Sequence, residues 1–133
     1  MRFATLVLTL TACSITATTA SAHHAFATEF DVNRAVELHG KVTKVELINP
    51  HSWIHIDVQD DKGNTVAWMI EGGSPNALVR RGINKNSIPI GSELVIRGYG
   101  TRDGTNKAVG RDIRFADGRE LFFSGSQPDA AQP

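Results

Sequence analysis

Two of the five histidines in this 133-residue chain, His23 and His24, follow directly on Ala20-Ser21-Ala22. Signal peptidase accepts such a small-residue pattern, and cleavage after Ala22 makes His23 the first residue. Its α-amine and its imidazole can then bind one ion as a chelate. An α-amine and an imidazole have reference pKa values of about 7.7–8.0 and about 6.5, so both can lose a proton to a metal near neutral pH. Nitrogen ligands of this kind suit Cu(II).

A third nitrogen would come from a histidine of the folded domain. His51 is the candidate, because it follows Pro50 at the start of a predicted strand and therefore lies at an end of the domain. His55 lies on the same strand face, but four residues of strand separate the two Cα atoms by about 13 Å, too far to share one ion. His39 is expected to be exposed. The predicted metal ligands are therefore His23, His24 and His51, with copper as the metal.

An outward aromatic side chain indicates a second kind of site. Trp53 lies two residues before His55 on the strand face opposite to the apolar Ile54. Aromatic side chains on the second strand of OB-type barrels stack against ligands. Trp53 and His55 are therefore predicted to form a ligand-binding face. The alternative is that residues 25–30 fold over the tryptophan ring and cover it.

Several classes of function are excluded or disfavoured by the sequence. The chain has 14 basic and 14 acidic residues, and this balance argues against a nucleic-acid binder. It contains no GxSxG, HExxH, CxxC or phosphate-binding glycine motif. Asp57 and Glu71 are expected to be solvated single carboxylates on separate strands rather than a catalytic pair. We therefore do not expect an enzyme.

The amino-terminal residues predict export. Arg2 precedes an apolar stretch over residues 3–10, which is shorter than the roughly 20 residues that a membrane span requires. Residues 1–22 are thus predicted to be a signal peptide, and the protein to be periplasmic or secreted. Leu10-Thr11-Ala12-Cys13 resembles a lipobox, so a lipid anchor at Cys13 is the alternative. Because Cys13 is the only cysteine, the chain after residue 22 has no disulfide.

The rest of the chain predicts strands separated by turns, with one short helix. Strands are expected over 36–47, 52–60, 65–71, 93–99 and 108–115, with a brief one over 121–123 and a helix over 74–82. In the first strand the apolar parity changes after Val42, which predicts a β-bulge, and Gly40 gives the backbone room to bend. Three strands, a helix and two strands predict a small five-stranded OB-like Greek-key barrel, with a β-sandwich as the alternative. The barrel would occupy residues 23–123, followed by a disordered tail over 124–133.

A series of short motifs resembles a family of exported bacterial proteins, the domain-of-unknown-function family DUF6152. The motifs are His23-His24, Phe26, Phe30-Asp31, Gly40-Lys41-Val42, Asn49-Pro50-His51, Trp68-Met69-Ile70-Glu71, Ser74-Pro75, Leu78 and Asp117-Gly118-Arg119. They occur in this order over nearly the whole chain after the signal. The resemblance implies an exported, β-rich domain whose activity is unassigned.

Two functions follow as hypotheses. The first is a non-catalytic periplasmic binding module that recognises a small ligand or an envelope protein through the Trp53 face. The second is a copper-binding protein that uses His23, His24 and His51. Exposure of the His23 amine by cleavage distinguishes them, because only the copper site requires it.

Overall fold

The structure is a computed structural model that describes residues 28–124. It contains six strands and one short helix in the order β1 (Phe30–Glu46), β2 (Trp53–Gln59), β3 (Thr65–Glu71), α2 (Pro75–Arg80), β4 (Glu93–Thr101), β5 (Lys107–Phe115) and β6 (Glu120–Phe122). The predicted signal peptide over residues 1–22, with Cys13, lies outside the described residues, and so do His23 and His24 and the tail from residue 125. Within residues 28–124, no helix has the length and apolarity needed to cross a membrane.

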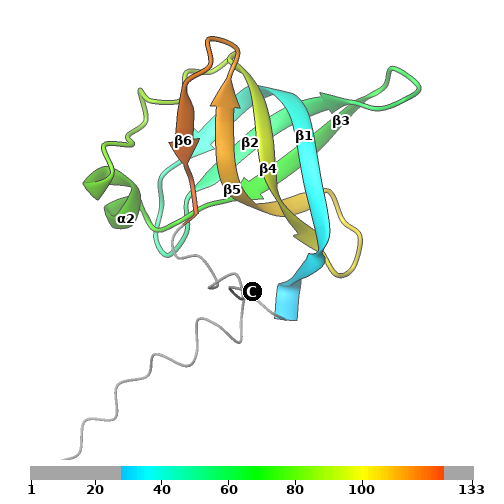
Figure 1. Ribbon diagram of the computed structural model, residues 1–133, viewed down its shortest axis with the longest axis horizontal. Coiled ribbons are helices and arrows are strands. Elements are labelled where there is room, and N and C mark those ends of the chain that lie inside the picture. Colours follow the sequence, from blue (N-terminus) through cyan, green and yellow to red (C-terminus); the bar gives the residue numbers. More distant parts are fainter. Residues whose placement is uncertain (1–27, 125–133) are drawn as a thin grey trace, which may run out of the picture.

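All six strands belong to one sheet, which curls into a barrel (Figure 1). The strand order is β3-β2-β1-β4-β5-β6, and an additional parallel pairing of Met69–Glu71 in β3 with Lys107–Val109 in β5 closes the sheet on itself. The closed part has the strand order of an OB-type barrel, and α2 lies between β3 and β4. The predicted small β-barrel is therefore confirmed, with β6 added beside β5.

The first strand is long because it pairs with two neighbouring strands, β4 and β2. Its early part pairs with β4 and its late part with β2, and the two pairings overlap at Gly40 and Lys41. The register with β2 shifts between Val42 and Lys44, which confirms the predicted bulge. A Cβ on Gly40 would lie 2.9 Å from Ile56 Cδ1, so glycine permits this close crossing. The strand starts at Phe30, six residues earlier than predicted. Residues 31–34 pair irregularly with β4, so no alternating pattern in the sequence indicates that they belong to the strand.

The barrel is filled by apolar side chains from every long strand. On β2, Ile54 and Ile56 are fully buried, whereas Trp53 and His55 on the other strand face are half-buried. Leu78 of α2 joins the same core. The helix begins as predicted, since the Ala77 amide donates to the Ser74 side chain and Pro75 occupies the first turn.

Candidate functional site

The end of β3 and the start of β2 meet at one rim of the barrel. Trp53 and Glu71 are direct partners in the antiparallel register of these strands. Beyond this pair, the Ser52 amide donates to the Gly73 carbonyl at 2.9 Å, and the Gly72 amide donates to the Ser52 carbonyl at 2.8 Å. These contacts hold Ser52 beside Gly72 and Gly73, so His51, the residue before Ser52, lies next to the end of β3.

At this rim the His51 imidazole forms an ion pair with the Glu71 carboxylate. The distance from Nδ1 to Oε1 is 2.5 Å, and the side chains are 51% and 11% exposed, respectively. Burial raises the pKa of Glu71 above its ordinary value. The positive charges of His51 and Lys107 act in the opposite direction, and the nearby Glu29 raises the pKa further. The pair therefore consists of a solvent-facing imidazole on a desolvated carboxylate.

The position of Glu71 corrects the expectation that it is a solvated, isolated carboxylate. Glu71 is buried, and it forms an ion pair with His51, which lies just before the neighbouring strand β2. The alternating pattern of β3 correctly predicts that Glu71 lies on the strand face opposite to Ile70. It does not predict which other residues cover that face. Asp57 stands opposite Ala67, away from this rim, so the two carboxylates do not form a catalytic pair.

Three histidines of the described chain each contact a glutamate, but they use different ring nitrogens. His39 and His55 contact Glu37 and Glu46 through Nε2, at 3.2 and 2.7 Å. His51 contacts its glutamate through Nδ1. An imidazole that directs a protonated Nδ1 at a carboxylate has Nε2 as its outer ring nitrogen, and Nε2 can bind a metal once it has lost its own proton. Among the described histidines, His51 is therefore the one whose contact with a glutamate uses Nδ1 and leaves Nε2 as the outer nitrogen.

The predicted Trp53 face is occupied by a lysine from β5. The ammonium of Lys107 lies 4.8 Å from the centroid of the Trp53 ring and forms an ion pair with Glu29. The same ammonium lies 5.8 Å from the Phe30 ring. His55 lies beside Trp53 with its Nε2 bound to Glu46. Ligand binding by Trp53 and His55 stays a prediction, and a ligand that stacks on the ring face covered by Lys107 has to displace the lysine.

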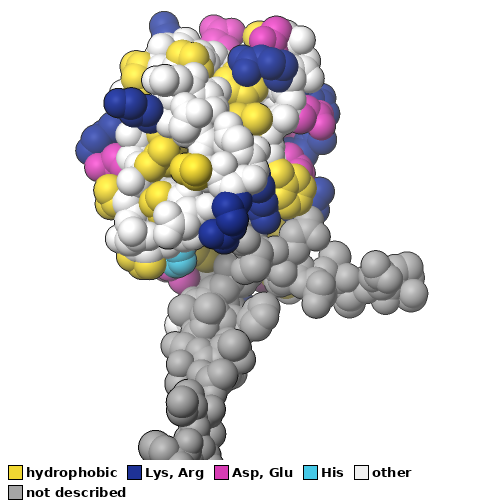
Figure 2. All heavy atoms as spheres, turned by 90° about the vertical axis from the view of Figure 1, so that its left-hand side faces the viewer, with side chains coloured by type: hydrophobic (Ala, Val, Ile, Leu, Met, Phe, Trp, Pro, Cys, Tyr) yellow, Lys and Arg dark blue, Asp and Glu magenta, His cyan; other side chains and the backbone are white. Residues whose placement is uncertain are grey.

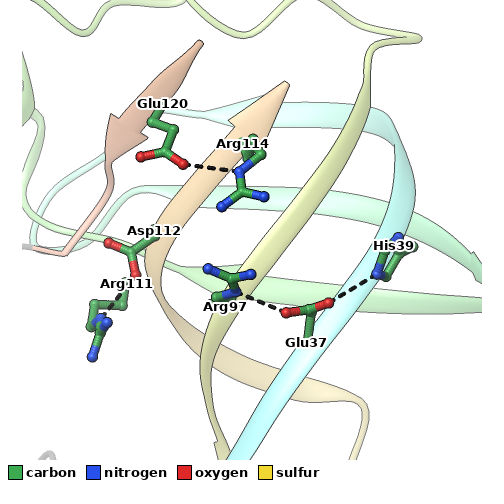
Figure 3. A network of polar contacts seen from close by, with 7 residues as sticks. All are labelled: Glu37, His39, Arg97, Arg111, Asp112, Arg114 and Glu120. Carbon is green, nitrogen blue, oxygen red and sulfur yellow. Dashed lines mark hydrogen bonds and ion pairs between the residues drawn. The ribbon is translucent and has the colours of Figure 1, made fainter. Parts of the chain in front are cut away.

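The other face of the barrel, seen in Figure 3, carries a row of ion pairs. Glu37 lies between His39 and Arg97, at 3.2 and 2.8 Å, and His39 is exposed as predicted. The remaining charged side chains of the row are also paired, Arg111 with Asp112 and Arg114 with Glu120. Exposed pairs of this kind contribute little to stability, and their charges cancel. This row therefore offers no net charge to attract a ligand.

The side that carries α2 and β6 is shown in Figure 2. Hydrophobic side chains appear there in separate groups, with lysines, arginines and other side chains between them. Val79 and Phe122 are among the exposed apolar residues of these elements. Scattered exposure of this kind is ordinary for a protein surface and does not indicate a binding site.

The predicted metal ligands are only partly within the described chain. Residues 28–124 contain no group of three His, Cys, Asp or Glu side chains arranged to hold a metal. His51 is described, whereas His23 and His24 lie outside these residues. A copper site would therefore combine one ligand of the barrel rim with ligands from the amino-terminal segment, and that ligand set stays a prediction.

Comparison with known proteins identifies a family but no activity. The model of a family of unknown function, DUF6152, matches residues 11–111. The comparison with curated proteins found no match. The comparison with solved structures found none either.

Proposed function

Because the chain belongs to the DUF6152 family, whose function is unknown, we propose its function from the site alone. The protein is an exported binding module that holds a copper ion at the barrel rim. His51 supplies the ligand of the barrel, and the amino terminus created by signal cleavage supplies the others. The proposal thus joins the binding-module and copper hypotheses in one site.

The arrangement of His51 on Glu71 is the observation that carries the proposal. Metal-binding histidines donate their second ring N–H to a carboxylate or carbonyl, which fixes the tautomer and makes the ligating nitrogen more basic. Glu71 lies 2.5 Å from Nδ1 and is nearly buried, whereas the imidazole is half exposed. Nε2 is therefore the ring nitrogen that we assign to the metal, which it binds after losing its proton.

The remaining ligands are the α-amine and imidazole of His23, with His24 beside them. His23 lies six positions before Glu29, so an extended chain between them spans about 20 Å at most. Glu29 forms an ion pair with Lys107, whose ammonium lies 4.8 Å from the centroid of the Trp53 ring at the rim. We infer from this that the amino-terminal histidines can reach His51.

Copper is the metal that this ligand set favours. The donors are nitrogens, and Cu(II) stands at the top of the affinity order of the divalent first-row metals. The chain after residue 22 offers no thiolate that would favour zinc or Cu(I). Storage, delivery or removal of copper outside the cytoplasm fits a single site on a small barrel without catalytic motifs.

Cu(II) affinity tests the proposal in a chain that begins at His23. Competition with a chelator should show tight binding by this chain and at least about tenfold weaker binding by His51→Ala and by His23→Ala. A chain with an amino-terminal tag should also bind weakly, because the tag removes the free amine at His23. The control is His55→Ala, which removes a histidine of the same strand and should leave the affinity unchanged. Absence of binding by the parent, or equal affinity in His51→Ala, would refute the proposal.

A further inference from the structure

A methionine and a histidine stand opposite each other on the outer face of the barrel. Met69 of β3 and His55 of β2 are direct partners in the antiparallel register of these neighbouring strands (Figure 1). The side chains of such partners point to the same face of the sheet, with their Cβ atoms about 4.5–5.5 Å apart. Met69 is 40% exposed, and the His55 side chain is 24% exposed. A thioether and an imidazole therefore lie within reach of each other and of solvent.

The His55 imidazole is oriented by a carboxylate. Its Nε2 lies 2.7 Å from Oε2 of Glu46, and the other oxygen of Glu46 pairs with Lys44 at 2.6 Å. A carboxylate that accepts a hydrogen bond from Nε2 fixes the ring and leaves Nδ1 as its second nitrogen. Nδ1 can bind a metal once it carries no proton. His55 thus offers one nitrogen donor on the strand face that carries the sulfur of Met69.

The chemistry of this donor pair differs from that of the rim. Nitrogen donors, such as His51 at the rim, suit Cu(II). The thioether of Met69 is a soft ligand, and soft ligands select Cu(I), while the imidazole of His55 is an ordinary ligand of copper. The pair therefore favours the reduced, monovalent ion.

The surroundings of the pair accept a monovalent cation. Trp53 lies two residues before His55 on the same strand face, diagonally opposite Met69, at a separation that an aromatic side chain can span. The face of a tryptophan ring attracts cations, and the Lys107 ammonium lies 4.8 Å from the centroid of this ring. Lys107 is also the partner of Met69 on β5, but its charge is balanced by its ion pair with Glu29. The neighbouring lysine therefore adds no net charge that would repel a bound cation.

We propose that Met69 and His55, flanked by the Trp53 ring, form a Cu(I) site on the outer face of β2 and β3. The site goes beyond the proposed function, because it takes a different oxidation state of copper and consists only of barrel residues. It gives the face predicted at Trp53 and His55 a ligand of stated chemistry, a soft monovalent metal ion.

Met69 provides a signal that reports on this site. The sequence has two methionines, Met1 and Met69, so a chain that begins at His23 retains only Met69. With methyl-labelled methionine this chain has one methionine methyl signal in the NMR spectrum. One equivalent of Cu(I), which is diamagnetic, should shift that signal under anaerobic conditions. His55→Ala should weaken the binding seen in this titration at least about tenfold. The matched control is His39→Ala, because His39 also contacts a glutamate through Nε2 but pairs with Val95 in the sheet, and it should leave the titration unchanged.

Competition with a chromogenic Cu(I) chelator measures the affinity. Met69→Leu keeps an apolar side chain of similar size and removes the sulfur, so the fold is retained. In a His51→Ala background, which lacks the rim ligand, Met69→Leu should lower the Cu(I) affinity at least about tenfold. In the parent chain, the same substitution should leave the Cu(II) affinity unchanged, since a thioether does not favour Cu(II).

The two copper sites are distinguished by their outcomes. His51→Ala should weaken Cu(II) binding and leave the Cu(I) shift of the Met69 methyl signal unchanged. No shift of this signal in the parent chain, or equal Cu(I) affinity with and without Met69→Leu, would overturn the inference. Binding of Cu(I) by a parent chain that does not bind Cu(II) would refute the proposed function and support the Met69 site.

Discussion

The Nδ1 atom of His51 and the Oε1 atom of Glu71 are 2.5 Å apart, across the strand ends that form one rim of the barrel. The contact joins a residue that precedes β2 to the last residue of β3. Its carboxylate is shielded from solvent by the fold, and its imidazole faces outward. An orienting carboxylate behind an accessible imidazole is one of the arrangements in which metal-binding histidines are held.

Glu71→Gln tests the orienting role of the carboxylate. The amide keeps the size of the side chain but removes the charge that places the ring proton on Nδ1, so Cu(II) affinity should fall about 10- to 100-fold. The matched control is Glu46→Gln at the His55 pair, which should leave copper affinity unchanged. Chelator competition measures both. Equal affinities for Glu71→Gln and the parent would show that the carboxylate does not support a ligand.

Ser52→Ala tests a buried hydroxyl beside the site. Ser52 is fully buried, and its Oγ has no hydrogen-bond partner among the described residues. Because an unpartnered hydroxyl gives up its hydration without replacement, its removal should leave the free energy of unfolding unchanged or raise it by up to about 1 kcal/mol. Urea denaturation measures the change. A loss of more than about 1 kcal/mol would mean that the hydroxyl has a partner in solution.

Gly72→Ala tests the packing beneath the rim. A Cβ at residue 72 would overlap the ring of Phe123, which is itself fully buried. Overpacking of this kind costs about 1–3 kcal/mol, because the ring or the backbone must move. Thermal and urea denaturation should show this loss. In a Phe123→Leu background the same substitution should cost less, and an undiminished cost would assign the effect to the backbone instead of the ring.

Asp103 makes stability depend on pH in the acid range. Hydrogen bonds from the Thr105 amide and from the Thr101 and Thr105 side chains lower the pKa of Asp103 from 3.8 to about 2. Between these values the unfolded chain binds a proton that the folded chain does not, so the parent loses stability as pH falls from about 4 to 2. Asp103→Asn should show a shallower loss over this interval in urea denaturation. Parallel curves for parent and variant would contradict the lowered pKa.

The strand pattern of the barrel was predictable from local sequence. The alternation of Ile54 and Ile56 with Trp53 and His55 indicates a strand with one buried face, and the parity change after Val42 indicates the bulge. Ser74-Pro75 indicates where the helix begins. These features depend only on residues that are close together in the sequence, so a single sequence is enough to predict them. The early start of β1 was missed, because its first residues pair irregularly with β4.

The candidate site was predictable only in part. His51 follows from its place after Pro50, but its partner Glu71 depends on the register of β2 with β3 and on burial at the rim. The Lys107 contact with Trp53 depends on the closure of the barrel by β3 and β5. Such contacts arise from tertiary pairing over 20 or more residues of sequence. The local pattern therefore identifies which side chains face outward, but not which of them meet.

The EPR spectrum of Cu(II) in a chain that begins at His23 tests the central claim most directly. The account predicts a single copper species with nitrogen ligands, including imidazole nitrogen from His51, and the loss of one such nitrogen in His51→Ala. A spectrum that is identical in the parent and in His51→Ala would contradict the account, because the barrel would then contribute no ligand to the metal.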